Sequence, residues 1–250
     1  MKRILFILSL VLPLPATLSA QVGEHRSELA IGAGAGYVMS SVGFTPRVPQ
    51  SQHGGVIAGV AARYTSEKYF NSICAIAGEV NIARIGWKEN ILDRNDNHVV
   101  NALTGTYEQY QRDMTYLQVP VFARLGWGRE RSGFQFFFQA GPQMGVFLGE
   151  STSSNFEIES RSSERVSQIV AQDSMAVEHK FDYGIAVGLG VEFSHRRLGH
   201  FMLEGRYYYG LGDIYGNTKR DYFARSNFGN IVVKLTYLID IRKTINPKIK

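Results

Sequence analysis

The sequence predicts an all-β protein whose single domain is an eight-stranded antiparallel up-and-down transmembrane β-barrel. Three observations lead to this prediction. Eight segments of the 250-residue chain place apolar residues at every second position, the connections between them are alternately long and short, and an export signal precedes them. The composition, 44% hydrophobic and 20% charged, excludes the collagen-like, coiled-coil and disordered classes.

The start of the chain has the pattern of a secretory signal peptide. Lys2 and Arg3 precede an apolar run over residues 4–12, and small residues close the segment. The run is too short for a transmembrane helix, which takes about 20 apolar residues. We therefore expect residues 1–20 to direct export and to be cleaved.

The mature chain, residues 21–250, is expected to form one domain, because no Pro-, Ser- or Gly-rich linker divides it. Its strands should cover roughly residues 29–240 and leave a short basic C-terminal tail. Of the 27 basic and 22 acidic residues, the signal segment and the last eleven residues hold six basic and one acidic, which leaves 21 of each sign. Because the rest of the chain carries no net charge, we expect no nucleic acid partner.

Alternation of period two defines the strands, since it sets an apolar face against a face of Gly, Ala, Gln and Tyr. Glycine at positions 32, 34 and 36 makes the first segment unsuitable for a helix. In chain order the alternating segments are 31–39, 56–64, 75–83, 116–127, 134–148, 181–193, 201–211 and 231–239.

The connections between these segments alternate in length. The long ones are 40–54, 91–106, 150–178 and 213–226, and the short ones are 66–72, 129–133 and 195–199. Between antiparallel strands, this alternation places every long loop at one end and every short turn at the other. Outer-membrane barrels have this plan, with periplasmic turns and outward loops. An even number of strands also brings both termini to the turn end.

The apolar face is expected to meet lipid. A soluble barrel of the lipocalin type, the alternative, would carry Lys, Glu and Asp densely on its polar face. Here the polar faces carry few charges, which gather in connections such as 88–94 and 157–165. We therefore expect the cell outer membrane as the location. The barrel must then be closed, because each unpaired backbone group at a strand edge in hydrocarbon costs several kcal/mol.

Aromatic and proline residues refine the strand assignment. The outward aromatic residues expected at the turn ends, as an interfacial girdle, are Tyr64, Trp127 and Tyr237. Trp87 has the opposite parity, which a girdle does not explain. Pro120 and Pro142 each remove a donor from the strand ladder and are expected to mark bulges or strand ends.

The inward parity collects four acidic and four basic residues, which form the candidate site: Arg63, Glu79, Arg124, Asp182, Glu192, Glu204, Arg206 and Lys234. Opposite charges inside a small barrel can pair, as Glu204 and Arg206 can along one strand. Two interpretations are open: a path for protons or ions, and a salt-bridged network that fills the interior. We favour the structural network.

Other patterns predict no catalytic, cofactor or metal site. Ser194 and His195 lie near Glu192, but adjacent strand residues point to opposite faces, so a hydrolase site is not expected. The glycine-rich first strand lacks the last glycine and the βαβ unit of a dinucleotide-binding loop. Cys74 is a single cysteine, and the six histidines are scattered along the chain.

Three short motifs carry a family resemblance. They are Tyr-Leu-Gln-Val-Pro at 116–120, Gly-Pro at 141–142 in the next strand, and Gly-Glu-Val at 78–80, ahead of Gly86. In these motifs the chain resembles the PorT-like outer-membrane β-barrel family. The resemblance implies an eight-stranded outer-membrane barrel without enzymatic activity. The founding member of that family is linked to a protein-secretion apparatus, a role that membership alone does not transfer.

Together these observations predict a monomeric barrel with a structural or interaction role and a closed polar lumen. The longest loop, 150–178, is expected to be the principal surface for a protein partner, although a self-packed loop is an alternative. Its apolar residues are Phe156, Ile158, Val166, Ile169 and Val170. The alternative function is transport, either as a narrow pore or as an accessory component of a protein-secretion apparatus.

Overall fold

The computed structural model describes residues 24–157, 159 and 161–244. The expected signal peptide, residues 1–20, lies outside these described residues. The strands are β1 (Glu24–Thr45), β2 (Gln50–Ser51), β3 (His53–Tyr69), β4 (Ser72–Glu89), β5 (Tyr110–Gly128), β6 (Gly133–Ser154), β7 (Phe181–His195), β8 (Gly199–Gly210) and β9 (Arg225–Arg242). A short 3-10 helix covers Ala171–Asp173. Within the described part of the chain, no helix has the length and apolar character needed to span a membrane.

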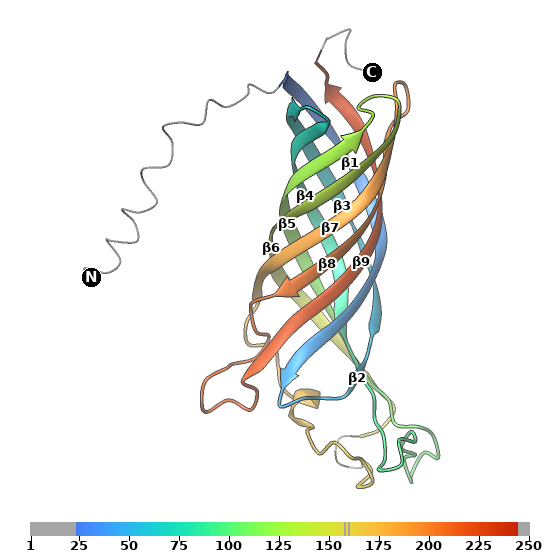
Figure 1. Ribbon diagram of the computed structural model, residues 1–250. Coiled ribbons are helices and arrows are strands. Elements are labelled where there is room, and N and C mark those ends of the chain that lie inside the picture. Colours follow the sequence, from blue (N-terminus) through green and yellow to red (C-terminus); the bar gives the residue numbers. More distant parts are fainter. Residues whose placement is uncertain (1–23, 158, 160, 245–250) are drawn as a thin grey trace, which may run out of the picture.

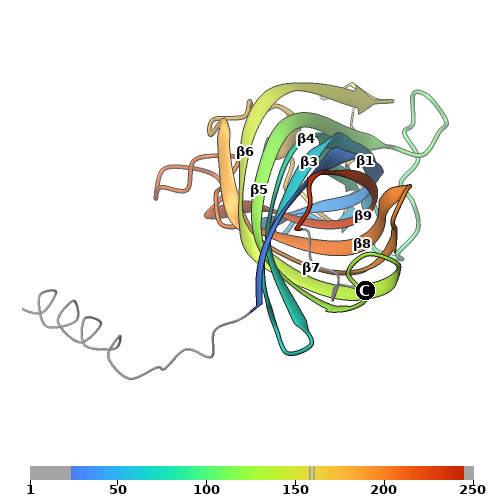
Figure 2. The same cartoon turned by 90° about the horizontal axis from the view of Figure 1, so that it is seen from above.

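The eight long strands form a closed antiparallel ring, which Figures 1 and 2 show from the side and from the end. Each long strand pairs with two neighbours, and the pairings of β4 with β5 and of β1 with β9 complete the circle. The two-residue β2 pairs only with the last residues of β4, at the loop end. The predicted all-β antiparallel barrel is therefore confirmed.

The alternation of loop lengths is also as predicted. The long connections are 46–52, 90–109, 155–180 and 211–224, whereas the short turns are 70–71, 129–132 and 196–198. Several strands are longer than the alternating segments, because polar residues continue the ladder beyond the apolar stretch. The pairing of β5 with β6, for example, runs to Tyr110 and Ser154. The loop expected at 150–178 is therefore shorter at its start.

The two faces of the sheet differ as the alternation predicts. On β7 the outward Leu189 is 69% exposed, whereas the inward Ala186 and Glu192 are buried. On β5 the outward face is apolar from Leu117 to Trp127 and becomes polar at Thr115. This apolar stretch, residues 117–127, has the length that a transmembrane strand needs, and the loop end of β5 extends past it.

Glycines on the inner face of β1 allow β9 to pack closely. A Cβ atom added at Gly32 would lie 1.8 Å from the Tyr237 carbonyl oxygen, and one at Gly36 would lie 2.2 Å from the Val233 carbonyl oxygen. These positions accept no side chain without moving backbone. The glycine-rich pattern therefore serves strand packing.

The prediction that Pro120 and Pro142 mark bulges or strand ends is wrong. Both lie inside strands, and the β5–β6 register is the same at Pro120↔Gln143 and Ala123↔Ala140. Each proline instead interrupts one ladder over two residue pairs, β4–β5 at Pro120 and β5–β6 at Pro142. A proline lacks an N–H on one side only, so the strand keeps its register through its other partner.

Aromatic residues occupy both surfaces of the ring. Trp127 donates to the Ser72 hydroxyl at 2.8 Å and Tyr237 donates to the Leu198 carbonyl oxygen at 2.6 Å, so both are fixed at the turn end. Trp87, which the girdle did not explain, is fully buried in the interior at the loop end. Its ring contacts Phe44 edge-on, with centroids 5.3 Å apart.

Candidate functional site

The structure places all eight predicted site residues on the inner face of the barrel. They come from β3, β4, β5, β7, β8 and β9, and none is more than 8% exposed. Seven of the eight fall into two ion-paired clusters, and Asp182 lies apart from both.

The central cluster joins four strands around Glu79. Arg206 donates to both oxygens of Glu79, at 3.0 and 2.9 Å, and the Lys234 ammonium donates to Oε2 at 2.9 Å. Arg206 also pairs with Glu204, as the sequence suggested. Gln139 donates to Glu204 at 2.7 Å, which brings β6 into the same network. The cluster therefore crosses the lumen and contains two acids and two bases.

The turn-side cluster is centred on Glu192. Its carboxylate accepts a hydrogen bond from Arg63 at 2.5 Å and another from Arg124. The Arg124 guanidinium also lies over the Phe137 ring, 3.6 Å from the centroid. These contacts satisfy a buried carboxylate with two cations, as burial of ions in a low dielectric requires.

Asp182 has a neutral partner instead. It lies near the loop end of β7 and accepts a hydrogen bond from the Tyr208 hydroxyl at 2.6 Å. Its other oxygen, Oδ1, has no hydrogen-bond partner among the described residues. Parity alone placed Asp182 correctly in the lumen but not in the ion-paired network.

His200 is a member of the turn-side cluster that sequence reasoning missed. Its Nδ1 lies 2.7 Å from Glu192 and 2.8 Å from the Ser194 hydroxyl, and its Nε2 lies 2.9 Å from Asp240. The register of the β7–β8 hairpin pairs Ser194 with His200. The histidine considered from the sequence, His195, is instead the half-buried last residue of β7, and its Nδ1 accepts hydrogen bonds from the Arg197 and Leu198 N–H groups at 3.3 Å. The sequence could have indicated this position, because His200 precedes the outward Phe201 and strand alternation therefore places it on the inner face.

These contacts include a serine, a histidine and an aspartate, yet the arrangement does not suit nucleophilic catalysis. A catalytic histidine needs a free ring nitrogen to take the serine proton. Here that nitrogen also faces Glu192, and the Ser194 hydroxyl itself donates to Glu192 at 3.2 Å. Ser194 is 1% exposed. The group is therefore better suited to holding the cluster together than to meeting a substrate.

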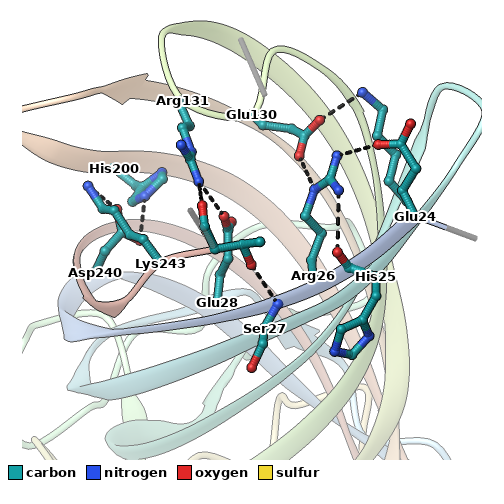
Figure 3. A network of polar contacts seen from close by, with 12 residues as sticks. Glu24, His25, Arg26, Ser27, Glu28, Glu130, Arg131, His200, Asp240 and Lys243 are labelled. Atoms are coloured by element: carbon teal, nitrogen blue, oxygen red, sulfur yellow. Dashed lines mark hydrogen bonds and ion pairs between the residues drawn. The ribbon is translucent and has the colours of Figure 1, made fainter. Parts of the chain in front are cut away.

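A polar network spans the turn end of the barrel, as Figure 3 shows. Glu130, in the β5–β6 turn, accepts hydrogen bonds from Arg26 at 2.9 Å and from Lys68 at 2.7 Å. Its neighbour Arg131 pairs with Glu28 at 3.1 Å. Burial alone would raise the pKa of the Glu130 carboxyl, but the hydrogen bonds from Arg26 and Lys68 outweigh it and hold that pKa below its usual value. The turn is thereby fastened to the first strand.

The loop end of the lumen is filled mainly by aromatic rings, beside an ion pair of 2.7 Å between Arg112 and Glu150. Phe44 packs on Phe223 and Tyr215, with centroids 4.8 and 6.3 Å away. Arg112 lies over the Trp87 ring at 5.5 Å. These rings belong to a larger buried cluster that reaches from the strand ends into the loops.

The long 155–180 loop packs back onto this aromatic layer. Arg112 donates to the carbonyl oxygens of Gln172 at 3.0 Å and Met175 at 2.6 Å. Arg165 pairs with Glu108 of the neighbouring loop at 2.6 Å. The apolar residues of this loop noted in the sequence differ in solvent exposure. Phe156 is buried, Ile169 and Val170 are half-buried, and Val166 is exposed. Ile158 lies outside the described residues. Much of the loop is thus held in place by contacts within the chain.

A metal site has no support in the side-chain arrangement. Among the residues that the structure places, no group of three or more His, Cys, Asp or Glu side chains could hold a metal ion.

Comparisons with known proteins agree with the barrel. The family model described as "Outer membrane protein beta-barrel domain" matches residues 19–216. No curated protein matches the chain. Among solved structures, Neisserial surface protein A is 13% identical with a TM-score of 0.41, and the match covers 84% of this chain and 96% of that one. OprG from Pseudomonas aeruginosa is 12% identical with a TM-score of 0.41, covering 87% and 98%. Ail, the attachment invasion locus protein of Yersinia pestis, is 14% identical with a TM-score of 0.36, covering 86% and 99%.

Proposed function

We propose that this chain, which belongs to the outer membrane protein beta-barrel domain family, is a structural or interaction protein with a closed lumen and with recognition loops on the cell surface. In this role it works without enzymatic activity, without a cofactor and as a monomer, surrounded by outer-membrane lipid. The observation that carries the proposal is the pairing of seven lumenal charges with one another across the barrel.

The lumenal contacts support a closed interior. An eight-stranded barrel encloses a space that side chains can fill. Glu79, Glu204, Arg206 and Lys234 fill it at mid-height, the Glu192 cluster fills the turn side, and aromatic rings fill the loop side. A solute would have to break several buried ion pairs to pass, which is costly because each separated charge would remain desolvated.

The transport alternative makes different demands on the same residues. A narrow pore needs a continuous polar path, and an accessory of protein secretion needs a stable partner. The PorT-like resemblance of the strand motifs favours the second form, but the match to the broader family does not distinguish between its members. Partner identification separates this alternative from a solitary barrel.

The location can be tested directly. The mature protein should be recovered with outer membranes after cleavage of residues 1–20, and it should migrate differently on a gel before and after boiling, because a closed barrel resists detergent until heated. Recovery of a soluble, uncleaved protein without detergent would refute the proposal.

The interaction role is tested by crosslinking in intact cells, with identification of the partners. The test variant lacks residues 156–174 of the long loop and has a short turn in their place. If this loop is the principal contact surface, the variant should keep its heat-dependent migration and lose the crosslinks. Deletion of the exposed residues 217–220, in the 211–224 loop, is the control. Unchanged crosslinks in the first variant would place recognition elsewhere.

A further inference from the structure

A row of aromatic rings crosses the outer surface of the barrel near the turn end. This aromatic row runs over the neighbouring strands β6, β7, β8 and β9 and consists of direct cross-strand partners, Phe134, Phe193, Phe201 and Tyr237. The ring centroids of Phe134 and Phe193 are 5.1 Å apart, and those of Phe201 and Tyr237 are 4.9 Å apart. On β1 the residue opposite Tyr237 is Ala33, so the row ends there. Outward aromatic rings at a strand end are typical of the level where hydrocarbon meets the headgroup layer.

The turn that joins β7 and β8 lies beyond the aromatic row. Arg196, its first residue, is three positions after Phe193, which is roughly 10 Å along a strand that rises ~3.3 Å per residue. Because barrel strands tilt by about 35–45°, this distance corresponds to about 7–8 Å along the membrane normal. The polar layer on each side of the hydrocarbon is about 5–8 Å thick. The turn is therefore at the depth of the lipid phosphate groups.

Exposed arginines occupy the turn end of the same strands. They are Arg129 in the β5–β6 turn, Arg196 and Arg197 in the β7–β8 turn, and Arg242 at the end of β9. Both turns are held against the aromatic row. The Arg129 N–H donates to the Phe134 carbonyl oxygen at 3.0 Å, and the Tyr237 hydroxyl donates to the carbonyl oxygen of Leu198, which follows Arg197.

These arginines have no acidic partner among the described residues. The other cations of the turn end do have one, as Figure 3 shows: Arg26 and Lys68 bind Glu130, Arg131 binds Glu28, and Lys243 binds Asp240. Glu67 lies on β3, on the opposite side of the ring from the β7–β8 turn. Unpaired positive charge is therefore concentrated on the side of the barrel that carries the aromatic row.

From this arrangement we propose that the turn end of β6–β9 is a binding site for an anionic phospholipid of the inner leaflet. Its phosphate lies at Arg196 and Arg197, with Arg129 on the neighbouring turn, and its acyl chains lie along the aromatic row. Guanidinium groups bind phosphate oxygens in pairs, and basic residues at the membrane surface attract anionic lipids. The proposal goes beyond the interaction role and rests only on the placement of the barrel in the outer membrane.

The test is native mass spectrometry of the purified full-length protein in detergent. The protein is titrated with phosphatidylglycerol and, separately, with phosphatidylethanolamine of the same acyl chains. We expect a saturable phosphatidylglycerol complex that is tighter by about fivefold or more, because phosphatidylethanolamine carries its own ammonium group beside the phosphate. Glycerol 3-phosphate, which has no acyl chains, should not compete at the same concentration. Equal affinity for the two lipids would overturn the proposal, and competition by glycerol 3-phosphate would replace the lipid by a free phosphate ester.

Two double variants locate the site, and each removes two positive charges. Arg196→Gln with Arg197→Gln alters the β7–β8 turn and should weaken phosphatidylglycerol binding by about tenfold or more. Arg94→Gln with Arg220→Gln alters two exposed positions at the loop end and should bind like the wild type. Equal binding by the two double variants would assign the preference to net charge and contradict the proposal.

Heat-dependent migration of each variant establishes that its barrel is intact. Absence of a preference for phosphatidylglycerol in a protein that fractionates with outer membranes would refute the lipid site alone. Failure to fractionate with outer membranes would instead refute the proposed location. Crosslinks from the β7–β8 turn to an acidic periplasmic protein, without a preference for phosphatidylglycerol, would assign the arginines to a protein partner and overturn the proposal.

Discussion

Glu192 is the residue on which the turn-side contacts converge, since it meets Arg63, Arg124 and His200 at once. Replacing it by Gln would leave the two guanidinium groups buried without a carboxylate. We expect Glu192→Gln to lower the free energy of unfolding by roughly 3–5 kcal/mol, measured by urea titration in a lipid environment. Glu164→Gln, at an exposed loop position, should change it by less than about 0.5 kcal/mol. Equal effects of the two substitutions would show that the buried pairing contributes little.

Glu130 makes the fastening of the β5–β6 turn dependent on pH. Its pKa in the folded protein lies below the ordinary value of 4.5, so its contribution to stability is complete above that value and is lost as the pH falls through the lower, folded value. We expect wild type to be more stable than Glu130→Gln at pH 7, with the difference shrinking below about pH 4. Unfolding midpoints measured across this range provide the test. A difference that grows on acidification would contradict the assigned ion pairs.

For single residues, the sequence predicted on which face of the barrel a side chain lies, but it did not predict which side chain it contacts. Parity along single strands was enough to place Glu79 and Lys234 inside the barrel. Their contact joins residues 155 positions apart and depends on how eight strands are staggered around the ring, which no local pattern encodes. Trp87 illustrates the same limit, because its inward parity was visible while the aromatic layer that receives it comes from loops and strand ends.

The first strand, β1, needs glycine on its inner face in order to pair closely with β9. At Gly36 an added Cβ would collide with backbone of β9, whereas at the outward Gly78 of β4 it would meet nothing within 4 Å. We expect Gly36→Ala to reduce the fraction of protein that refolds into the heat-modifiable form, and Gly78→Ala to leave that fraction unchanged. Gel densitometry after refolding into lipid measures both. Full refolding of Gly36→Ala would mean that β1 and β9 can separate enough to admit a methyl group.

The strand cores were predictable, but the strand ends were not. Period-two alternation of apolar and polar residues marks the part of each strand that passes through hydrocarbon. Beyond the belt both faces of a strand are polar or mixed, as from Tyr110 to Thr115 in β5, so the alternation disappears while the ladder continues. Pro120 and Pro142 were wrongly predicted to mark bulges or strand ends for a related reason. In a closed ring each strand has two neighbours, so a strand can lose hydrogen bonds to one neighbour and stay paired with the other.

At the scale of the whole molecule, the buried side chains of the interior form three groups, from the Glu192 cluster at the turn end to the aromatic rings at the loop end. We expect purified protein in planar bilayers to show little or no steady conductance, because the charges are paired and the mouth on the loop side is lined by buried aromatic rings. Glu164→Gln should behave identically. Stable, large single-channel currents would refute the closed lumen and favour the pore.

The ion pairs of the lumen also have a consequence for the order of events during biogenesis. Glu79 enters the bilayer with the third long strand, yet its partners Arg206 and Lys234 arrive only with the last two. Before β9 joins β1, Arg206 faces both Glu79 and Glu204 without Lys234, so the central cluster carries one unbalanced negative charge. Closure of the ring and the charge balance of the central cluster are therefore reached in the same step, when β9 pairs with β1 and brings Lys234 to Glu79.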